Sequence, residues 1–211
     1  NDRRGRGRFV RSYEEANKLE PTAAAFASLG TIRLAEGATG AAESAFRRAV
    51  ELEPEALGPH LALANFLMAT NRLPEAEQSL LRALELDKGN VLAHRALAVF
   101  YMGTGRLPKA EPHVQALAAQ DTSPTARYKL ALADLYILTK RTDEALAVLE
   151  PLRNTKEAFA AAQTRFGRLQ FARKQPAEAL KTIDEVLARE PRNVAALLAK
   201  GTFLHAARRY D

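Results

Sequence analysis

Apolar and polar residues recur along most of this chain with the period of an α-helix. Apolar or small side chains stand three or four positions apart, for example at Phe26, Leu29, Gly30 and Ile32. This spacing places them on one face of a helix, whereas a half-buried strand would show a period of two. The pattern therefore predicts an all-helical chain with little room for strands.

Polar turns and helix-stopping residues divide this pattern into pairs of helices. A short polar turn, such as residues 70–72, separates the first helix of a pair from the second. Proline stands in the first turn of several second helices, at Pro74, Pro108 and Pro176, where its missing amide hydrogen costs no hydrogen bond. The second helices end at turn signals such as residues 190–193.

The helix pairs repeat at a nearly fixed interval. An alanine in each second helix recurs every 34 residues, with one interval of 35 whose extra residue falls near residues 121–124. These alanines are Ala42, Ala76, Ala110, Ala145 and Ala179. A period in this range predicts stacked helical units that bury their apolar faces against one another.

At these positions the sequence resembles the tetratricopeptide repeat family, whose unit has 34 residues. If the first unit starts at Ala23, then Leu29-Gly30 fill its seventh and eighth positions, Phe46 the twenty-fourth and Pro54 the thirty-second. The resemblance extends over roughly residues 21–211. It implies an all-α fold in which helix-turn-helix repeats stack into a right-handed superhelical solenoid, as in bacterial tandem-repeat proteins.

The repeat predicts one solenoid over residues 9–211, preceded by a basic, disordered arm over residues 1–8. Residues 9–20 form a partial repeat helix, full repeats start near residues 23, 57, 91, 126 and 160, and residues 194–211 form a half repeat. Because the pattern stops within a repeat, we expect a piece of a longer protein, and the presence of a signal or lipid anchor in that protein stays open. Pro151 should end its helix near Glu150, and Pro112 falls inside another second helix.

Charge and composition exclude several functions. The formal net charge is +6, but residues 1–12 carry +4 of it and the remainder is nearly balanced. A basic end on a balanced body argues against nucleic-acid binding along the repeats. The chain has no Cys, which excludes disulfides and thiolate metal sites, and it has no apolar stretch of the roughly 20 residues that a membrane span needs.

No catalytic, cofactor or metal site is predicted. His60 and His94 occupy equivalent positions in neighbouring repeats, but no third ligand stands beside them, and we expect them to be partly buried structural residues. The segment Gly103-Thr104-Gly105 lacks the Lys-Ser/Thr of a phosphate loop. We therefore expect no enzyme activity in this chain.

The helical period predicts which side chains line the inner face of the solenoid. The second, fifth, ninth and twelfth repeat positions, here called the groove positions, lie opposite the packed fourth, seventh, eighth and eleventh positions. Both methionines of the chain occur among them, and Met suits surfaces that adapt to varied ligands. In chain order these residues are Leu61, Asn65, Met68, Leu92, Arg95, Val99, Met102, Arg127, Leu130, Asp134, Ile137, Thr164, Arg168 and Phe171.

Two interpretations of this row stay open. It could be a groove that binds a peptide or protein segment, with Met68, Met102, Ile137 and Phe171 as apolar contacts and Asn65 and Arg95 as polar ones. It could also be partly core, if a tightly wound superhelix buries it. The family's clamp for chaperone carboxylates needs Lys and Asn at the fifth and ninth positions of one helix, and no repeat here has that pair.

The leading hypothesis is a protein–protein interaction scaffold without a cofactor. The alternative is the regulatory or substrate-recruiting region of a larger enzyme, or of a secretion or envelope assembly, whose other domains are absent. Self-association through exposed repeat ends is a further hypothesis. Composition and short segments are similar to bacterial envelope proteins of this family, which tilts localisation toward the envelope and leaves the cytoplasm open.

Overall fold

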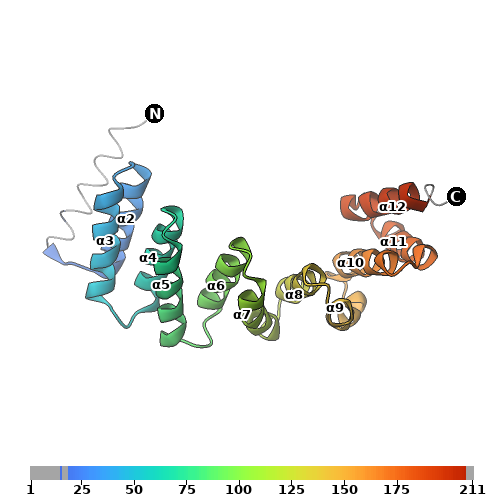
Figure 1. The fold of residues 1–211 in the computed structure, drawn as a ribbon, viewed down its shortest axis with the longest axis horizontal. Coiled ribbons are helices and arrows are strands. Elements are labelled where there is room, and N and C mark those ends of the chain that lie inside the picture. The colour runs from blue at the N-terminus through green and yellow to red at the C-terminus, as the bar shows by residue number, and fades with distance from the viewer. Residues whose placement is uncertain (1–14, 16–18, 208–211) are drawn as a thin grey trace. The chain divides into compact units, whose positions relative to one another are not determined.

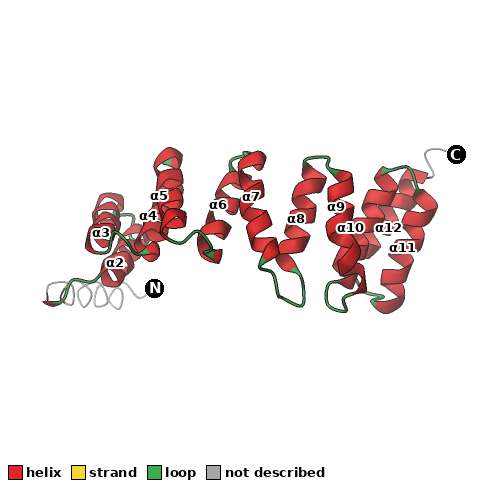
Figure 2. Cartoon of the chain, turned by 90° about the horizontal axis from the view of Figure 1, so that it is seen from below, coloured by secondary structure: helices red, strands yellow, loops and turns green. Residues whose placement is uncertain are grey.

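The computed structural model describes residue 15 and residues 19–207. Over this part of the chain the secondary structure consists of eleven α-helices and one 3₁₀ helix, without a strand (Figure 1, Figure 2). The predicted all-α fold is confirmed. The predicted arm over residues 1–8, and most of the predicted helix over residues 9–20, lie outside the described residues.

The chain divides into two compact units, Asn1–Thr104 and Gly105–Asp211. In the first unit α2 pairs with α3 and α4 with α5, while α3 contacts α4 and α5 contacts α6. A single solenoid over residues 9–211 stays a prediction. The bounds in this unit are α2 (Ala23–Ala35), α3 (Thr39–Leu52), α4 (Leu57–Ala69), α5 (Leu73–Leu86) and α6 (Val91–Gly103).

In the second unit α8 packs between α7 and α9, and α10 and α11 form a hairpin that contacts α12. The 3₁₀ helix η1 follows α9 and lies against α10. The bounds are α7 (Leu107–Ala119), α8 (Arg127–Leu138), α9 (Thr142–Leu149), η1 (Glu150–Asn154), α10 (Phe159–Ala172), α11 (Pro176–Arg189) and α12 (Val194–Ala207).

Small residues allow the two helices of a hairpin to approach closely. The recurring alanines Ala42, Ala76, Ala110, Ala145 and Ala179 are all 0% exposed. At the eighth repeat position, a Cβ added to Gly30 would lie 2.9 Å from the Phe46 ring, and one added to Gly167 would lie 3.1 Å from Ile183 Cδ1. Gly201 has the same repeat position but open space around it, because no second helix follows α12 within the described residues.

The turn between first and second helices uses the left-handed backbone region in every repeat. The residues in this conformation are Gly37, Asn71, Gly105, Lys140 and Lys174, with φ between 59° and 80°. Gly and Asn adopt it at little cost, whereas a lysine does so less readily. This shared turn reverses the chain after each first helix.

Proline affects two second helices differently. α7 continues through Pro112 to Ala119. Near Pro151 the α-helical pattern ends instead, since α9 stops at Leu149 and the chain continues as η1. Pro151 has no amide hydrogen with which to continue α9, and α9 has only 8 residues, compared with 14 for α11.

Candidate functional site

The histidines in equivalent repeat positions are structural. Nε2 of His60 lies 2.8 Å from the carbonyl oxygen of Pro54, and Nε2 of His94 lies 2.9 Å from that of Lys88. Both rings are buried, and since a carbonyl can only accept, each ring nitrogen donates the hydrogen bond. Each histidine thus ties the start of a first helix to the turn before it. The described residues contain no group of three His, Cys, Asp or Glu side chains placed to hold a metal ion.

In the first unit, apolar groove positions are exposed on α6. Leu92 is 48% exposed, Val99 64% and Met102 38%. Leu92 and Val99 stand two helical turns apart, and Met102 follows one turn later, so the three side chains share one face of the helix. We call these three residues the α6 stripe.

A polar side chain accompanies the α6 stripe. Arg95 is exposed on the same face, and within the described residues it has no ion-pair partner. On α4, Asn65 is exposed, and Leu61 and Met68 are half-buried. The groove positions of this unit therefore offer exposed apolar surface, together with a guanidinium and an amide that have no side-chain partner among the described residues.

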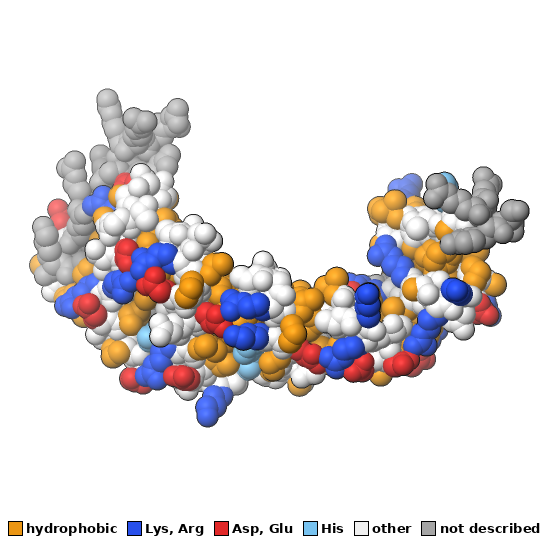
Figure 3. Space-filling view, in the orientation of Figure 1, with side chains coloured by type: hydrophobic (Ala, Val, Ile, Leu, Met, Phe, Trp, Pro, Cys, Tyr) orange, Lys and Arg blue, Asp and Glu red, His pale blue; other side chains and the backbone are white. Residues whose placement is uncertain are grey.

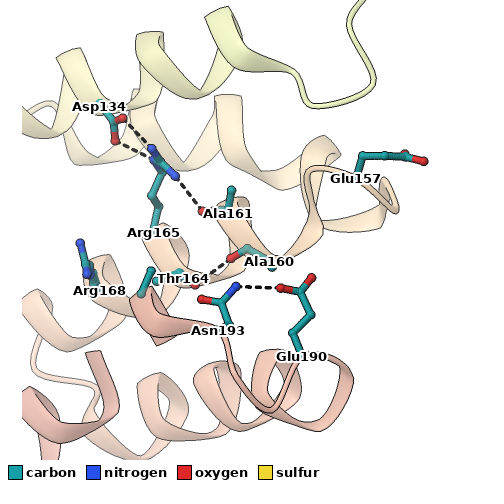
Figure 4. Close-up of a pocket in the computed structure, with 10 residues that line it drawn as sticks. Asp134, Glu157, Ala160, Ala161, Thr164, Arg165, Arg168, Glu190 and Asn193 are labelled. Carbon is teal, nitrogen blue, oxygen red and sulfur yellow. Dashed lines mark hydrogen bonds and ion pairs between the residues drawn. The ribbon is translucent and has the colours of Figure 1, made fainter. Parts of the chain in front are cut away.

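In the second unit, groove positions surround a cavity of about 580 Å³ (Figure 4). We call it the Arg165 pocket. Its lining comes from α8, from α10 as far as Arg168, from the start of α12 and from the connections before α10 and α12, and small residues (Ala160, Ala161 and Ala195) form part of it. Thr164 is buried in this lining and donates a hydrogen bond of 2.7 Å to the carbonyl oxygen of Ala160.

An ion pair fixes one side of the Arg165 pocket. Nε and Nη2 of Arg165 donate to the two carboxylate oxygens of Asp134 at 2.7 and 2.8 Å, and Nη1 donates to the carbonyl oxygen of Ala161 at 3.1 Å. This two-pronged geometry is the strong form of an arginine–carboxylate contact. The pair joins α8 to α10 and is electrically neutral, so it gives this side a defined shape without a net charge.

Asn193 positions the start of α12 beside the pocket. Its Oδ1 accepts from the amide of Ala196 at 3.0 Å, and its Nδ2 donates to Glu190 at 2.8 Å. The side chain therefore caps the helix, as asparagine does where the first amides lack partners. This cap places Glu190 and Asn193 at the edge of the cavity (Figure 4).

The structure brings three of the predicted groove residues together and separates others from this site. Asp134 and Arg168, both at the ninth position of their repeats, line the Arg165 pocket together with Thr164 at the fifth position. Phe171 stacks on Phe203 with ring centroids 4.3 Å apart and packs against a buried cluster, and Ile137 is half-buried. Leu130 is only 8% exposed, so at this position the row is part of the core, as the second of the two interpretations has it.

The pocket also contains residues that the sequence did not identify. Arg165 stands at the sixth repeat position, about 60° around the helix from the ninth, and reaches the pocket because its side chain is long. Glu157, Glu190 and Asn193 belong to connections between helices, where helical periodicity carries no information about direction. The tendency of Asn to cap helices was the only available signal for Asn193.

Positive and negative side chains are mixed over the surface drawn in Figure 3. Many of the arginines are held in ion pairs, such as Arg72 with Glu43 and Arg141 with Glu111. A nucleic-acid surface would instead show a stripe of one sign. In the described part of the chain, no helix is both long and apolar enough to cross a bilayer.

A family model of the tetratricopeptide repeat matches residues 33–85, 78–135 and 136–201. These matches cover most of the chain, which therefore belongs to the tetratricopeptide repeat family. No curated protein matches the sequence.

Solved structures of the same fold resemble the chain at low sequence identity. YrrB, described as a tetratricopeptide repeat protein with an unusual peptide-binding site, matches with a TM-score of 0.67 and 16% identity, over 91% of this chain and 99% of that one. MamA gives 0.64 and 20%, over 81% and 92%. PilF of Pseudomonas aeruginosa gives 0.61 and 19%, over 93% and 86%. At these identities the likeness establishes the fold alone.

Proposed function

We propose that this chain is a protein-interaction scaffold that binds an extended segment of another protein at its groove positions. The α6 stripe carries this proposal, because three large apolar side chains on one helix face remain 38–64% exposed. Burying such side chains against a ligand is favourable by about 25 cal/mol for each Å² of apolar surface removed from water.

Two further observations support a binding surface over a purely structural one. The packed face of α6 is complete without the stripe, since His94, Leu97, Ala98 and Tyr101 are all buried. Arg95 is exposed on the same helix as the stripe and Asn65 is exposed on α4, and both can bond to the backbone or side chains of a bound segment. The solved structure of YrrB is described as having a peptide-binding site, which agrees with this use of the fold.

The proposal is tested with a displayed library of random 12-residue peptides selected on the full chain. An enriched peptide is then synthesised and titrated against the wild type and Met102→Glu. We expect affinity to fall at least tenfold, because the new carboxylate must lose water without a partner when the ligand binds. Thermal stability should stay near that of the wild type.

Leu81→Glu is the matched control. Leu81 lies on α5 of the same unit and is 39% exposed, against 38% for Met102, but it belongs to a second helix. This variant should bind the peptide as the wild type does. Equal losses in the two variants, or unfolding of Met102→Glu, would contradict a role of the α6 stripe in binding.

The alternative of a recruiting region within a larger enzyme or envelope assembly concerns other domains and stays a hypothesis. It requires the same binding surface, so the experiment above bears on both.

A further inference from the structure

We propose that the Arg165 pocket selects an extended segment that carries one acidic and one basic side chain in a fixed order. This inference rests on the proposed function and names the chemistry of the ligand at one site of the second unit. It follows from how charged groups that form no ion pair among the described residues are distributed around the cavity.

The two ends of the pocket carry opposite charges. Arg168 is exposed at one end, and within the described residues its guanidinium takes part in no ion pair. Glu157 and Glu190 stand at the other end, with Thr164 and Asn193 between (Figure 4). Asn193 donates to one oxygen of Glu190, and neither glutamate has a cationic partner among the described residues. An acidic group would therefore bind near Arg168 and a basic group near the glutamates.

The middle of the pocket allows close approach of a backbone. Ala160, Ala161 and Ala195 have short side chains, and the hydroxyl of Thr164 is turned to the carbonyl of Ala160. Each of the three nitrogens of Arg165 donates one hydrogen bond, to Asp134 or to Ala161. The centre of the pocket thus has no net charge and few polar groups. Selectivity for a ligand therefore depends on the charged groups at the two ends.

The length of α10 gives the separation of the two ligand charges. From Phe159, two positions after Glu157, to Arg168 there are nine residue steps of helix, which rise roughly 14 Å at 1.5 Å per residue. An extended chain rises about 3.3 Å per residue, so roughly four residues span this distance. We therefore expect the acidic and basic side chains to be three to five positions apart.

This distribution of charges disfavours a polyanionic ligand. A phosphate backbone repeats its negative charge along its length and would place several charges beside Glu157 and Glu190. A segment with both signs avoids that repulsion, and the order of its charges fixes its direction along the pocket. Complementary charges of this kind contribute more to selectivity than to affinity.

The test uses the same 12-residue library on the full chain, with selections on the wild type, Arg168→Glu and Lys181→Glu. Lys181 is exposed on α11 of the same unit, outside the pocket, so its variant matches the change in net charge. The wild type should enrich peptides with an acidic and a basic residue three to five positions apart, in one order. Selection on Arg168→Glu should enrich peptides that carry a basic residue in place of the acidic one. Selection on Lys181→Glu should enrich the same peptides as the wild type.

A synthetic peptide measures the effect directly. Its affinity should fall about tenfold in Arg168→Glu and recover when its acidic residue is changed to lysine. One result would overturn this inference and leave the proposed function standing: the enriched peptides lack the charge pair, and they bind the wild type but not Met102→Glu. An unchanged preference in Arg168→Glu, or the same change in Lys181→Glu, would also overturn it. Failure to enrich any peptide would contradict both.

Discussion

Nη1 of Arg72 lies 2.6 Å from Oε1 of Glu43, 29 positions earlier in the sequence. Arg72 precedes α5 and Glu43 belongs to α3, so this bond joins neighbouring repeats. Arg72 also binds Glu75 at the start of its own helix. In the second unit Arg141 makes the equivalent pair of bonds, with Glu111 at 2.6 Å and with Glu144 at 2.7 Å. An arginine at this turn thus links one repeat to the previous one.

Glu43 should make the stability of the first unit depend on pH. The hydrogen bond from Arg72, and then the one from Arg47, hold the pKa of Glu43 below its ordinary value of 4.5. A carboxyl with a lowered pKa in the folded state contributes stability above its unfolded pKa, and this contribution is lost as pH falls through the folded pKa. Glu43→Gln should therefore lower the free energy of unfolding at pH 7 and have progressively less effect in acid.

Urea unfolding of the wild type and Glu43→Gln between pH 7 and pH 3 measures this difference. Glu53→Gln is the control, because Glu53 is exposed and outside the ion pairs of the described residues. A difference between wild type and Glu43→Gln that stays constant over this range would show that the bond to Arg72 contributes no net stability.

Gly167→Leu should destabilise the second unit. A Cβ at this position would lie 3.1 Å from Ile183 Cδ1 and 3.4 Å from the carbonyl oxygen of Ala179, so a larger side chain must push α11 away from α10. Overpacking of this kind costs about 1–3 kcal/mol. Gly201→Leu is the matched control at the same repeat position, where nothing lies within 4 Å, and it should not lower the unfolding free energy, because leucine favours a helix more than glycine does. Similar values for the two variants in urea unfolding would refute the close approach at Gly167.

Asp121 organises the connection that absorbs the extra residue between the third and fourth repeats. Its carboxylate accepts from the amides of Ser123, Tyr128 and Lys129 at 3.0, 2.6 and 3.3 Å. The residue before α8, Ala126, offers no side-chain cap, so Asp121 serves the first amides of that helix. Burial raises the pKa of Asp121, but the hydrogen bonds from Ser123, Tyr128 and Lys129 outweigh it and hold the pKa below 3.8.

Asp121→Ala should therefore cost about 1 kcal/mol or more, as the loss of a helix cap does. Because the pKa is lowered, the stability from Asp121 is present above its unfolded pKa and disappears as pH falls through the folded value. Asp121→Asn keeps one acceptor oxygen and should lose less. Thermal melts at pH 7 rank the stability of the wild type and the two variants. If Asp121→Asn is as unstable as Asp121→Ala, the lost stability comes from the charge of Asp121 and not from capping.

The class of fold could be predicted from the sequence because every repeat carries the same evidence for it. The same small residue recurs at the hairpin contact, as at Ala76 and Ala179, and each occurrence points to the same packing. The proposed ligand site depends on residues that do not recur from repeat to repeat. Asp134 and Arg168 followed from helical angles, but Glu157 and Glu190 lie in connections whose course depends on η1 and on the cap at Asn193. A helical pattern cannot place such residues.

The neutrality of the Asp134–Arg165 pair provides the final prediction. Asp134→Asn keeps an acceptor for Arg165 but removes the negative charge, so the end of the pocket near Arg168 gains one net positive charge. A peptide with an acidic residue should bind several-fold more tightly, and this gain should shrink as salt screens the added charge. Titrations at low and physiological salt measure both effects.

Asp184→Asn serves as the control for this change. Asp184 pairs with Lys200 at 2.7 Å in the same unit, and its replacement by Asn removes the same charge as Asp134→Asn. Asp184 does not line the Arg165 pocket. Its variant should bind the peptide with nearly the wild-type affinity, since an exposed charge outside the site is screened over about 8–10 Å. Equal gains in the two variants would mean that the net charge of the unit attracts the peptide, and the Arg165 pocket would have no part in selecting it.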